Sequence, residues 1–254
     1  MTAITRYVAL GDSFTEGIGD PNPYSANGLR GWADLVAVQL ANGNPDFRYA
    51  NLGVRGRTMG DVIDHQVNVA IELKPDLTTI YAGMNDLLKL RTDLDTMMAR
   101  YADALARLKQ TGTRVVTFTA ADIGTVPVFR RLRGRAAIYN ELLRAIVDDL
   151  GIELVDFWRF NEFRDARMWD DDRIHPSPLG HKQIAARVLD VLGIPHALTD
   201  PNGLNMDNWV PISRLRSDLY WVAAFAVPWV MRRLRRLTPG AGVEPKLASL
   251  SSVF

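Results

Sequence analysis

The sequence predicts an α/β protein, a three-layer α/β/α sandwich built around a parallel sheet. Five short β-rich segments alternate with helix-like segments along the first 195 residues. Most of the β-rich segments are continuously apolar, which is typical of strands covered on both faces. This alternation favours parallel strands joined by right-handed crossovers.

The predicted elements follow one another in a regular order along the chain. The five strands are predicted at residues 7–10, 48–52, 77–82, 114–119 and 153–157. The helices are predicted at residues 32–40, 59–73, 94–108, 136–150 and 179–192. Thr58 is a candidate N-cap for the second helix, and Ser177-Pro178 is a cap-then-proline signal for the last one. Residues 120–135 form a long connection of the kind that often serves function.

Composition limits the classes of protein that the chain can belong to. Its 254 residues are 47% hydrophobic and 23% charged, which is ordinary for a globular protein. The net charge of +1 gives no reason to expect a nucleic-acid partner. The chain has no cysteine, so disulfides and thiolate metal sites are excluded. The N-terminus shows no signal peptide pattern, and we therefore expect a cytoplasmic protein.

The C-terminal part differs in character from the rest and predicts a second region. We predict a main domain at residues 1–195, a connector with an apolar and basic helix at 196–237, and a disordered tail at 238–254. The apolar run at 219–231 is too short for the ~20 residues of a membrane-spanning helix. Two alternatives therefore stay open for residues 213–237: packing on the domain body or a second subunit, and peripheral contact with a membrane.

Ser13 is the candidate nucleophile. It lies in the stretch Gly11-Asp12-Ser13, directly after the first predicted strand, and ligands bind at such strand ends in α/β sheets. A serine needs an adjacent base at neutral pH, and His175 can take and return a proton there. Asp172 precedes it by three residues and can hold the other ring nitrogen. The three residues therefore predict a catalytic triad.

Two further strand-end segments supply candidates for an oxyanion hole. The backbone N–H groups of Ser13 and Gly56 and the side-chain amide of Asn85 can donate to a developing negative charge. Gly56 lies in a segment that follows the second predicted strand, and Asn85 follows the third. Because the carboxyl ends of parallel strands meet at one sheet edge, we expect these donors to converge on Ser13. Gly53 is interpreted as a turn residue rather than a donor.

Four strand-end segments thus carry the candidate residues: those of Ser13, of Gly56, of Asn85, and of Asp172 and His175. Together they resemble the SGNH hydrolases, also called the GDSL family of esterases and lipases, over about residues 6 to 193. The pattern reads Gly-Asp-Ser, Asn-x4-Gly-x-Thr, Gly-x-Asn-Asp and Asp-x2-His. The resemblance implies a flavodoxin-like fold with five parallel strands. It also implies a serine esterase that hydrolyses carboxylic esters, with thioesters and lipid esters in its range, through an acyl-enzyme on Ser13. No cofactor or metal is implied, and the partner is a small-molecule ester.

Several alternatives remain at this level. The same triad would also serve an acyltransferase, and the same fold would also serve a non-catalytic binding module. Residues 170–172, three consecutive aspartates, together with His175 are an alternative hard-metal site. Arg130 and Arg131, after the long connection, are either solvated or attract an anionic substrate.

Overall fold

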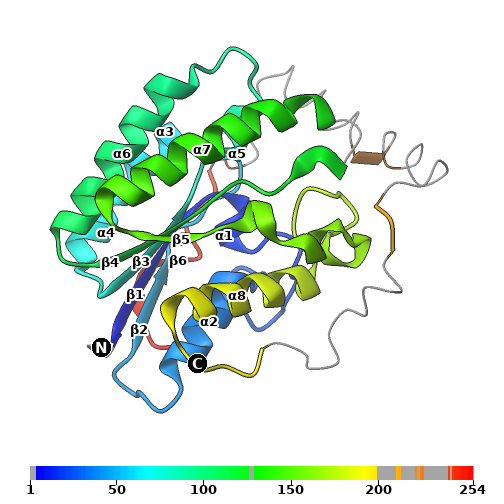
Figure 1. Cartoon of the computed structure of the whole chain (residues 1–254). Helices are drawn as coiled ribbons and strands as arrows, with labels where there is room; N and C mark the ends of the chain where they lie inside the picture. Colours follow the sequence, from blue (N-terminus) through cyan, green and yellow to red (C-terminus); the bar gives the residue numbers. More distant parts are fainter. Residues whose placement is uncertain are drawn as a thin grey trace.

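The chain folds around a six-stranded sheet with helices on both faces (Figure 1). The computed structural model describes residues 4–125, 129–198, 210–212, 221, 224–225, 240 and 242–253. The strands lie in the order β5-β4-β3-β1-β2-β6. Their bounds are β1 (Arg6–Gly11), β2 (Arg48–Asn51), β3 (Leu77–Tyr81), β4 (Arg114–Phe118), β5 (Glu153–Val155) and β6 (Leu247–Ser251). Strands β1 to β5 are parallel, so their carboxyl ends lie at one edge of the sheet.

The helices connect successive strands and cover the sheet. They are α1 (Ser13–Glu16), α2 (Trp32–Ala41), α3 (Met59–Val62), α4 (Asn68–Leu73), α5 (Met84–Leu87), α6 (Leu94–Gln110), α7 (Arg133–Leu150) and α8 (Pro178–Leu192). A π-helical turn, η1 (Ile63–Val67), joins α3 to α4 in one continuous helix. Short 3₁₀ turns fill the connections: η2 (Ile123–Thr125), η3 (Arg130–Leu132), η4 (Phe157–Arg159), η5 (Asn161–Arg164) and η6 (Ala166–Met168).

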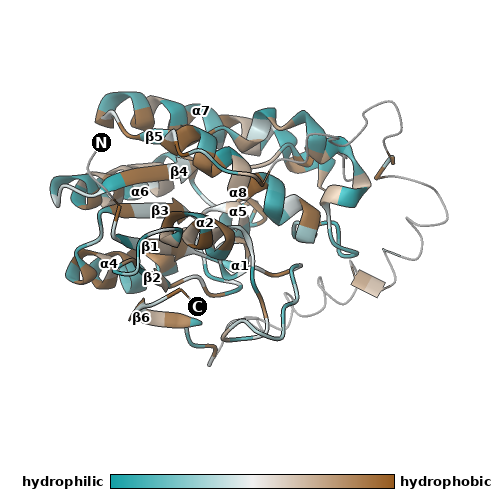
Figure 2. Cartoon of the chain, turned by 90° about the horizontal axis from the view of Figure 1, so that it is seen from below, coloured by the Kyte–Doolittle hydropathy of each residue, from teal (hydrophilic) through white to brown (hydrophobic). Residues whose placement is uncertain are grey.

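Two hydrophobic cores lie on opposite faces of the sheet. In β1, Val8 and Leu10 join the core under α3, α6 and α7, whereas Tyr7 and Ala9 join the core under α2 and α8. All four residues are buried because successive side chains of a strand point to opposite faces. This double burial explains the continuously apolar strand. Figure 2 shows the mixed hydropathy of the surrounding helices, with apolar segments along the sheet.

The predicted order of strands and helices is confirmed for the main domain. All five predicted strands are present, and each predicted helix matches an observed one within a few residues. The Thr58 side chain accepts a hydrogen bond from the backbone of Asp61 and forms a capping box with it. Ser177 caps α8, with Pro178 as its first residue. These local signals work because they satisfy the unpaired N–H groups of a first helical turn.

The sheet has six strands, and the prediction of five is wrong by one. The additional strand, β6, runs antiparallel to β2 and pairs Ser251 with Tyr49 and Leu247 with Asn51. It lies in the tail predicted to be disordered at residues 238–254, so that prediction is wrong for residues 247–251. The segment is short and half-exposed, which gives a weak pattern in sequence. The open edge of β2, about 200 residues earlier in the chain, is what orders it.

Most of the predicted connector and helix at residues 196–237 lies outside the described residues. Val210 is described, and its backbone N–H donates to the carboxylate of Asp165 at 3.2 Å. Trp221, Ala224 and Phe225 are described as well. Among the helices of the described part, none is long and apolar enough to cross a membrane.

Candidate active site

Ser13 lies at the carboxyl end of the central strand β1, at a turn that only glycine can begin. Gly11 has φ of 152°, and a Cβ atom there would lie 2.4 Å from Thr15 Oγ1 and 2.6 Å from the Tyr81 carbonyl oxygen. The chain therefore turns sharply between the strand and α1. Asp12 caps α1 by accepting a hydrogen bond from the Phe14 backbone N–H at 3.1 Å. Ser13 is thus the first residue of the helix.

Ser13, His175 and Asp172 form a continuous hydrogen-bonded chain. The Nε2 atom of His175 lies 2.9 Å from Ser13 Oγ, and its Nδ1 atom lies 2.5 Å from the Asp172 carboxylate. The carboxylate can only accept, which assigns the Nδ1–H tautomer to a neutral ring and leaves Nε2 to accept from the serine hydroxyl. Ser13 and His175 lie 162 positions apart in the sequence, and with Asp172 they have the geometry that a serine nucleophile, its base and an orienting acid require.

The loop that carries Asp172 and His175 is held by its own carboxylate. One oxygen of Asp172 accepts hydrogen bonds from the backbone N–H groups of Ile174 and His175, at 2.8 and 2.9 Å. Burial raises the pKa of Asp172, but its hydrogen bonds with His175 and Ile174 and the charge of His175 outweigh burial and hold the pKa below its usual value. Asp172 is therefore ionised at neutral pH and able to stabilise an imidazolium.

The predicted oxyanion donors lie beside Ser13 in the same pocket. Gly56 and Asn85 both line it. Gly56 has φ of 77°. Among the described residues, the backbone N–H groups of Ser13 and Gly56 have no hydrogen-bond acceptor. The N–H of Gly53, by contrast, donates to Asn51 Oδ1 at 3.0 Å. This agrees with the interpretation of Gly53 as a turn residue.

Asp12 has a buried side-chain carboxyl group directly beside these residues. It is 2% exposed, and it accepts a hydrogen bond from the side-chain amide of Asn85 at 3.2 Å. The same amide donates to the Arg57 carbonyl oxygen at 2.9 Å. Burial raises the pKa of Asp12 to about 7, although the hydrogen bond from Phe14 and the charge of His175 lower it. The pair joins the ends of β1 and β3.

A buried ion pair supports the loop that contains Gly56. Glu16 is 1% exposed and accepts the backbone N–H of Arg55 at 2.7 Å. It also accepts the Arg55 guanidinium at 2.5 Å. The ion pair has no signal in the sequence, because its partners lie 39 residues apart and nothing in their local pattern links them.

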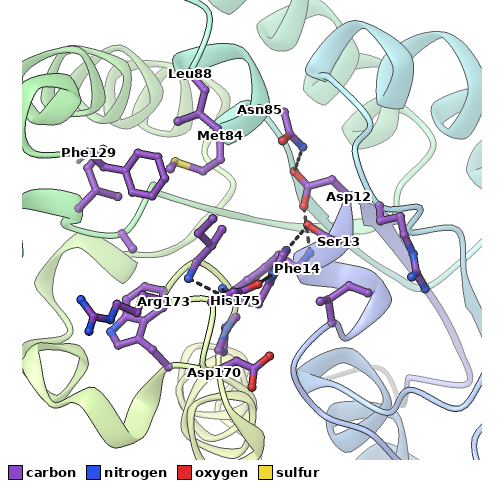
Figure 3. Close-up of a pocket in the computed structure, with 18 of the residues that line it drawn as sticks. Asp12, Ser13, Phe14, Met84, Asn85, Leu88, Phe129, Asp170, Arg173 and His175 are labelled. Atoms are coloured by element: carbon purple, nitrogen blue, oxygen red, sulfur yellow. Dashed lines mark hydrogen bonds and ion pairs between the residues drawn. The ribbon is translucent and has the colours of Figure 1, made fainter. Parts of the chain in front are cut away.

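The pocket around Ser13 has a volume of about 400 Å³ and is mostly apolar on one side. Figure 3 shows Met84, Leu88 and Phe129 together on one side of the Ser13–His175 pair, with Asn85 and Asp12 on the other. This volume falls within the roughly 300–1,000 Å³ of small-molecule sites. The pocket can therefore hold a substrate with an apolar group next to the serine.

The alternative sites predicted from sequence are not assembled here. Within the described ranges, no group of three or more His, Cys, Asp or Glu side chains lies close enough to hold a metal. Asp172 is instead used by His175. Arg130 and Arg131 are exposed and do not line the pocket.

The parallel sandwich and the strand-end site together define an ester-hydrolysing enzyme. The chain belongs to the GDSL-like Lipase/Acylhydrolase family, whose family model matches residues 9–183. Small-molecule esters are accordingly the substrates that the family implies. No curated protein matches the chain significantly.

Solved structures of esterases share the fold. LAE5, an alpha/beta hydrolase enzyme from the metagenome of Lake Arreo, Spain, is 25% identical, with a TM-score of 0.64 over 76% of this chain and 97% of that one. The acetyl xylan esterase AlAXEase is 20% identical, with a TM-score of 0.61 over 73% and 98%. Axe2, an acetylxylan esterase from Geobacillus stearothermophilus, is 21% identical, with a TM-score of 0.61 over 75% and 95%. These structures cover about three quarters of this chain.

Proposed function

We propose that this chain hydrolyses carboxylic esters through an acyl-enzyme on Ser13, with His175 as the general base and Asp172 as the residue that orients it. The observation that carries this proposal is the unbroken hydrogen-bond chain from Ser13 Oγ through both ring nitrogens of His175 to Asp172. A serine in such a chain can lose its proton as it attacks, which an isolated serine at neutral pH cannot do readily.

The reaction proceeds in two halves. Ser13 Oγ attacks the ester carbonyl carbon while its proton passes to Nε2 of His175, and a tetrahedral oxyanion forms. The C–O bond to the alcohol then breaks, and the leaving oxygen takes the proton from Nε2. A water molecule next gives its proton to Nε2 and attacks the acyl-enzyme carbonyl, which releases the acid and restores Ser13.

Three donors hold the oxyanion in this proposal. Two of them are the backbone N–H groups of Ser13 and Gly56. Their role as donors is supported because neither has a hydrogen-bond acceptor among the described residues and both residues line the pocket. The side-chain amide of Asn85 is the third: the Arg57 carbonyl oxygen keeps one of its two hydrogens, and the hydrogen now donated to Asp12 passes to the oxyanion as the charge develops. The two backbone donors are fixed in advance and need no rearrangement when the charge develops, which is why they lower the barrier.

Replacement of Ser13 by alanine tests the proposal directly. Ser13→Ala should abolish turnover of p-nitrophenyl butyrate and labelling by a fluorophosphonate probe, with an unchanged circular dichroism spectrum. Ser249→Ala, at an exposed serine of β6, is the matched control and should behave like the wild type. Equal labelling of the wild type and Ser13→Ala would refute the assignment of Ser13. Product analysis in the presence of added methanol measures how much acyl group goes to water.

A further inference from the structure

Trp221 touches the loop of the triad although it lies outside the region that matches the family. The family model ends at residue 183. The indole Nε1–H of Trp221 donates to the backbone carbonyl oxygen of Asp172 at 2.7 Å, and the side chain is buried, with 3% exposed. Trp221 belongs to the C-terminal extension, by which we mean the connector and helix predicted at residues 196–237. It therefore bonds directly to the peptide that follows Asp172.

That peptide is held on both of its polar groups: the Arg173 N–H donates to the Asp170 carbonyl oxygen at 2.8 Å, and Trp221 bonds the Asp172 carbonyl oxygen. Arg173 has φ of 56°, a left-handed conformation that costs a non-glycine residue roughly 1 kcal/mol or more. The Asp172 carbonyl belongs to the peptide plane that defines this angle, so the Trp221 hydrogen bond fixes the plane. The guanidinium of Arg173 also lies over the Trp221 ring, 5.5 Å from its centre. Trp221 thus contacts this loop twice, at the Asp172 carbonyl oxygen and at the Arg173 side chain.

Trp221 also packs against a residue on the apolar side of the pocket. Its ring meets the ring of Phe129 edge to face, with centres 6.3 Å apart and planes at 79°. Phe129 lines the pocket together with Met84, Leu88 and Phe225. Phe225 lies four residues after Trp221 and is half-buried against the same core. The extension therefore contributes both a support for the triad loop and part of the pocket wall.

The composition of this wall favours an apolar group of substantial size. The four side chains on this side, Met84, Leu88, Phe129 and Phe225, are apolar, whereas the charged side chains of Asp122, Asp170 and Arg173 line other parts of the pocket. An acetyl group has two carbon atoms and would leave most of a 400 Å³ cavity unfilled. A longer aliphatic chain would instead exchange water for contact with Met84, Leu88, Phe129 and Phe225, at a gain of ~0.8 kcal/mol per buried methylene.

We infer that two residues beyond the family match complete this active site: Trp221 is a positioning residue for Asp172, and Phe225 closes a site for the acyl chain of esters of medium-length aliphatic acids. The inference rests on the proposed function, since it takes Ser13 as the nucleophile. It goes beyond that function because it assigns a substrate class and two residues outside the family-matching region.

A series of p-nitrophenyl esters from acetate to decanoate tests the acyl-chain site. We expect kcat/KM to rise about fourfold per added methylene until the cavity is full, which is ~0.8 kcal/mol converted to a rate ratio. Phe225→Ala should lower kcat/KM for the octanoate about tenfold or more and leave the acetate within twofold. Phe225→Trp should shift the optimum to shorter chains. An optimum at acetate, unmoved by both variants, would overturn the acyl-chain site.

Trp221→Phe tests the positioning role because it keeps an aromatic ring and removes the N–H. We expect kcat to fall about threefold to tenfold for acetate and octanoate alike, with KM within twofold, since the triad rather than the pocket is disturbed. Trp158→Phe is the matched control, at a tryptophan that does not line the pocket, and should leave kcat unchanged. An unchanged kcat in Trp221→Phe would overturn the positioning role.

Labelling by alkyl fluorophosphonates separates this inference from the proposed function. Ser13 should react faster with an octyl than with a methyl phosphonofluoridate, and Phe225→Ala should remove the difference. Labelling of Ser13 at equal rates by both probes would reject the acyl-chain site and leave Ser13 as the nucleophile. Failure of both probes to label Ser13 would reject the proposed function together with the inference.

Discussion

The side-chain amide of Asn85 donates a hydrogen bond to the carboxylate of Asp12, the residue that precedes Ser13, at 3.2 Å. The two residues lie 73 positions apart and follow the adjacent strands β3 and β1. The bond fixes the Asn85 amide beside Ser13, and the Arg57 carbonyl oxygen accepts its other hydrogen. Both amide hydrogens are bonded within the protein, so donation by Asn85 to a substrate oxygen requires the hydrogen on Asp12 to turn to that oxygen.

Replacement of Asn85 by alanine should lower kcat far more than it changes KM. If the amide donates to the oxyanion, its loss costs about 2.7–4 kcal/mol of transition-state stabilisation, or roughly 100-fold to 1,000-fold in kcat. The measurement is steady-state hydrolysis of p-nitrophenyl butyrate by Asn85→Ala. Asn42→Ala, at an exposed asparagine after α2, is the control. A kcat within threefold of the wild type would exclude Asn85 from the oxyanion hole.

Asp12 should make the protein less stable as the pH rises from about 4 to about 7. Burial raises its pKa to about 7, whereas an unfolded chain loses this proton near pH 3.9. Between these values the native state binds a proton that the unfolded state has lost, so rising pH lowers the free energy of unfolding, by up to roughly 4 kcal/mol. Asp12→Asn cannot ionise and should lack this decline.

Urea unfolding of the wild type and Asp12→Asn at intervals from pH 4.5 to 8 measures the effect. As the pH rises, the free energy of unfolding of Asp12→Asn should increase relative to that of the wild type. Parallel curves would mean that Asp12 keeps an ordinary pKa in the folded protein.

Glu16→Gln should weaken both stability and catalysis. The carboxylate is 1% exposed and accepts the backbone and side chain of Arg55, which precedes Gly56. Loss of a hydrogen bond to a charged group costs about 1.5–3 kcal/mol, and the half-exposed Arg55 side chain keeps the loss moderate because water can solvate it. We expect a lower free energy of unfolding and a reduced kcat, since the Gly56 N–H loses its support.

A surface ion pair provides the comparison for Glu16→Gln. Arg100 and Asp64 are paired at 2.9 Å, and both side chains are more than half exposed. Arg100→Gln should therefore change the free energy of unfolding by less than about 1 kcal/mol and leave kcat unaltered. If the two variants lower the free energy of unfolding equally, the buried Glu16–Arg55 pair contributes no more to stability than an exposed pair.

Lys246→Met should destabilise the protein strongly. The ammonium lies at the start of β6 with 1% of its side chain exposed, and it donates to the carbonyl oxygens of Glu16, Leu29 and Arg30 and to the carboxylate of Asp34. Burial lowers its pKa, although Asp34 opposes this. Removal of one partner of a buried pair costs about 3–5 kcal/mol because the other charge stays buried.

Urea unfolding of Lys246→Met against Lys182→Met measures this cost. Lys182 lies on α8, and the described residues give its ammonium no hydrogen bond or ion pair. A loss below about 1 kcal/mol in Lys246→Met would mean that β6 is held by its strand pairing alone.

The sequence by itself determined the parallel sandwich and the identity of the residues around Ser13. The continuously apolar strands, the helix caps at Thr58 and Ser177, and the four strand-end segments are local signals. Parallel topology then brings the ends of those strands to one edge, so Ser13, Gly56, Asn85 and the Asp172–His175 loop were predicted to converge. The structure places all of them in one pocket.

Only the tertiary structure decided how that site is held and bounded. The Asp12–Asn85 bond, the Glu16–Arg55 pair, the Lys246 anchor of β6 and the Trp221 bond to Asp172 join residues between 39 and 230 positions apart. None has a local signature, because a buried charge or an indole N–H is satisfied by whichever group the fold brings to it. The apolar wall beside Ser13 is a property of packing for the same reason, and it is where we expect the selection among esters to take place.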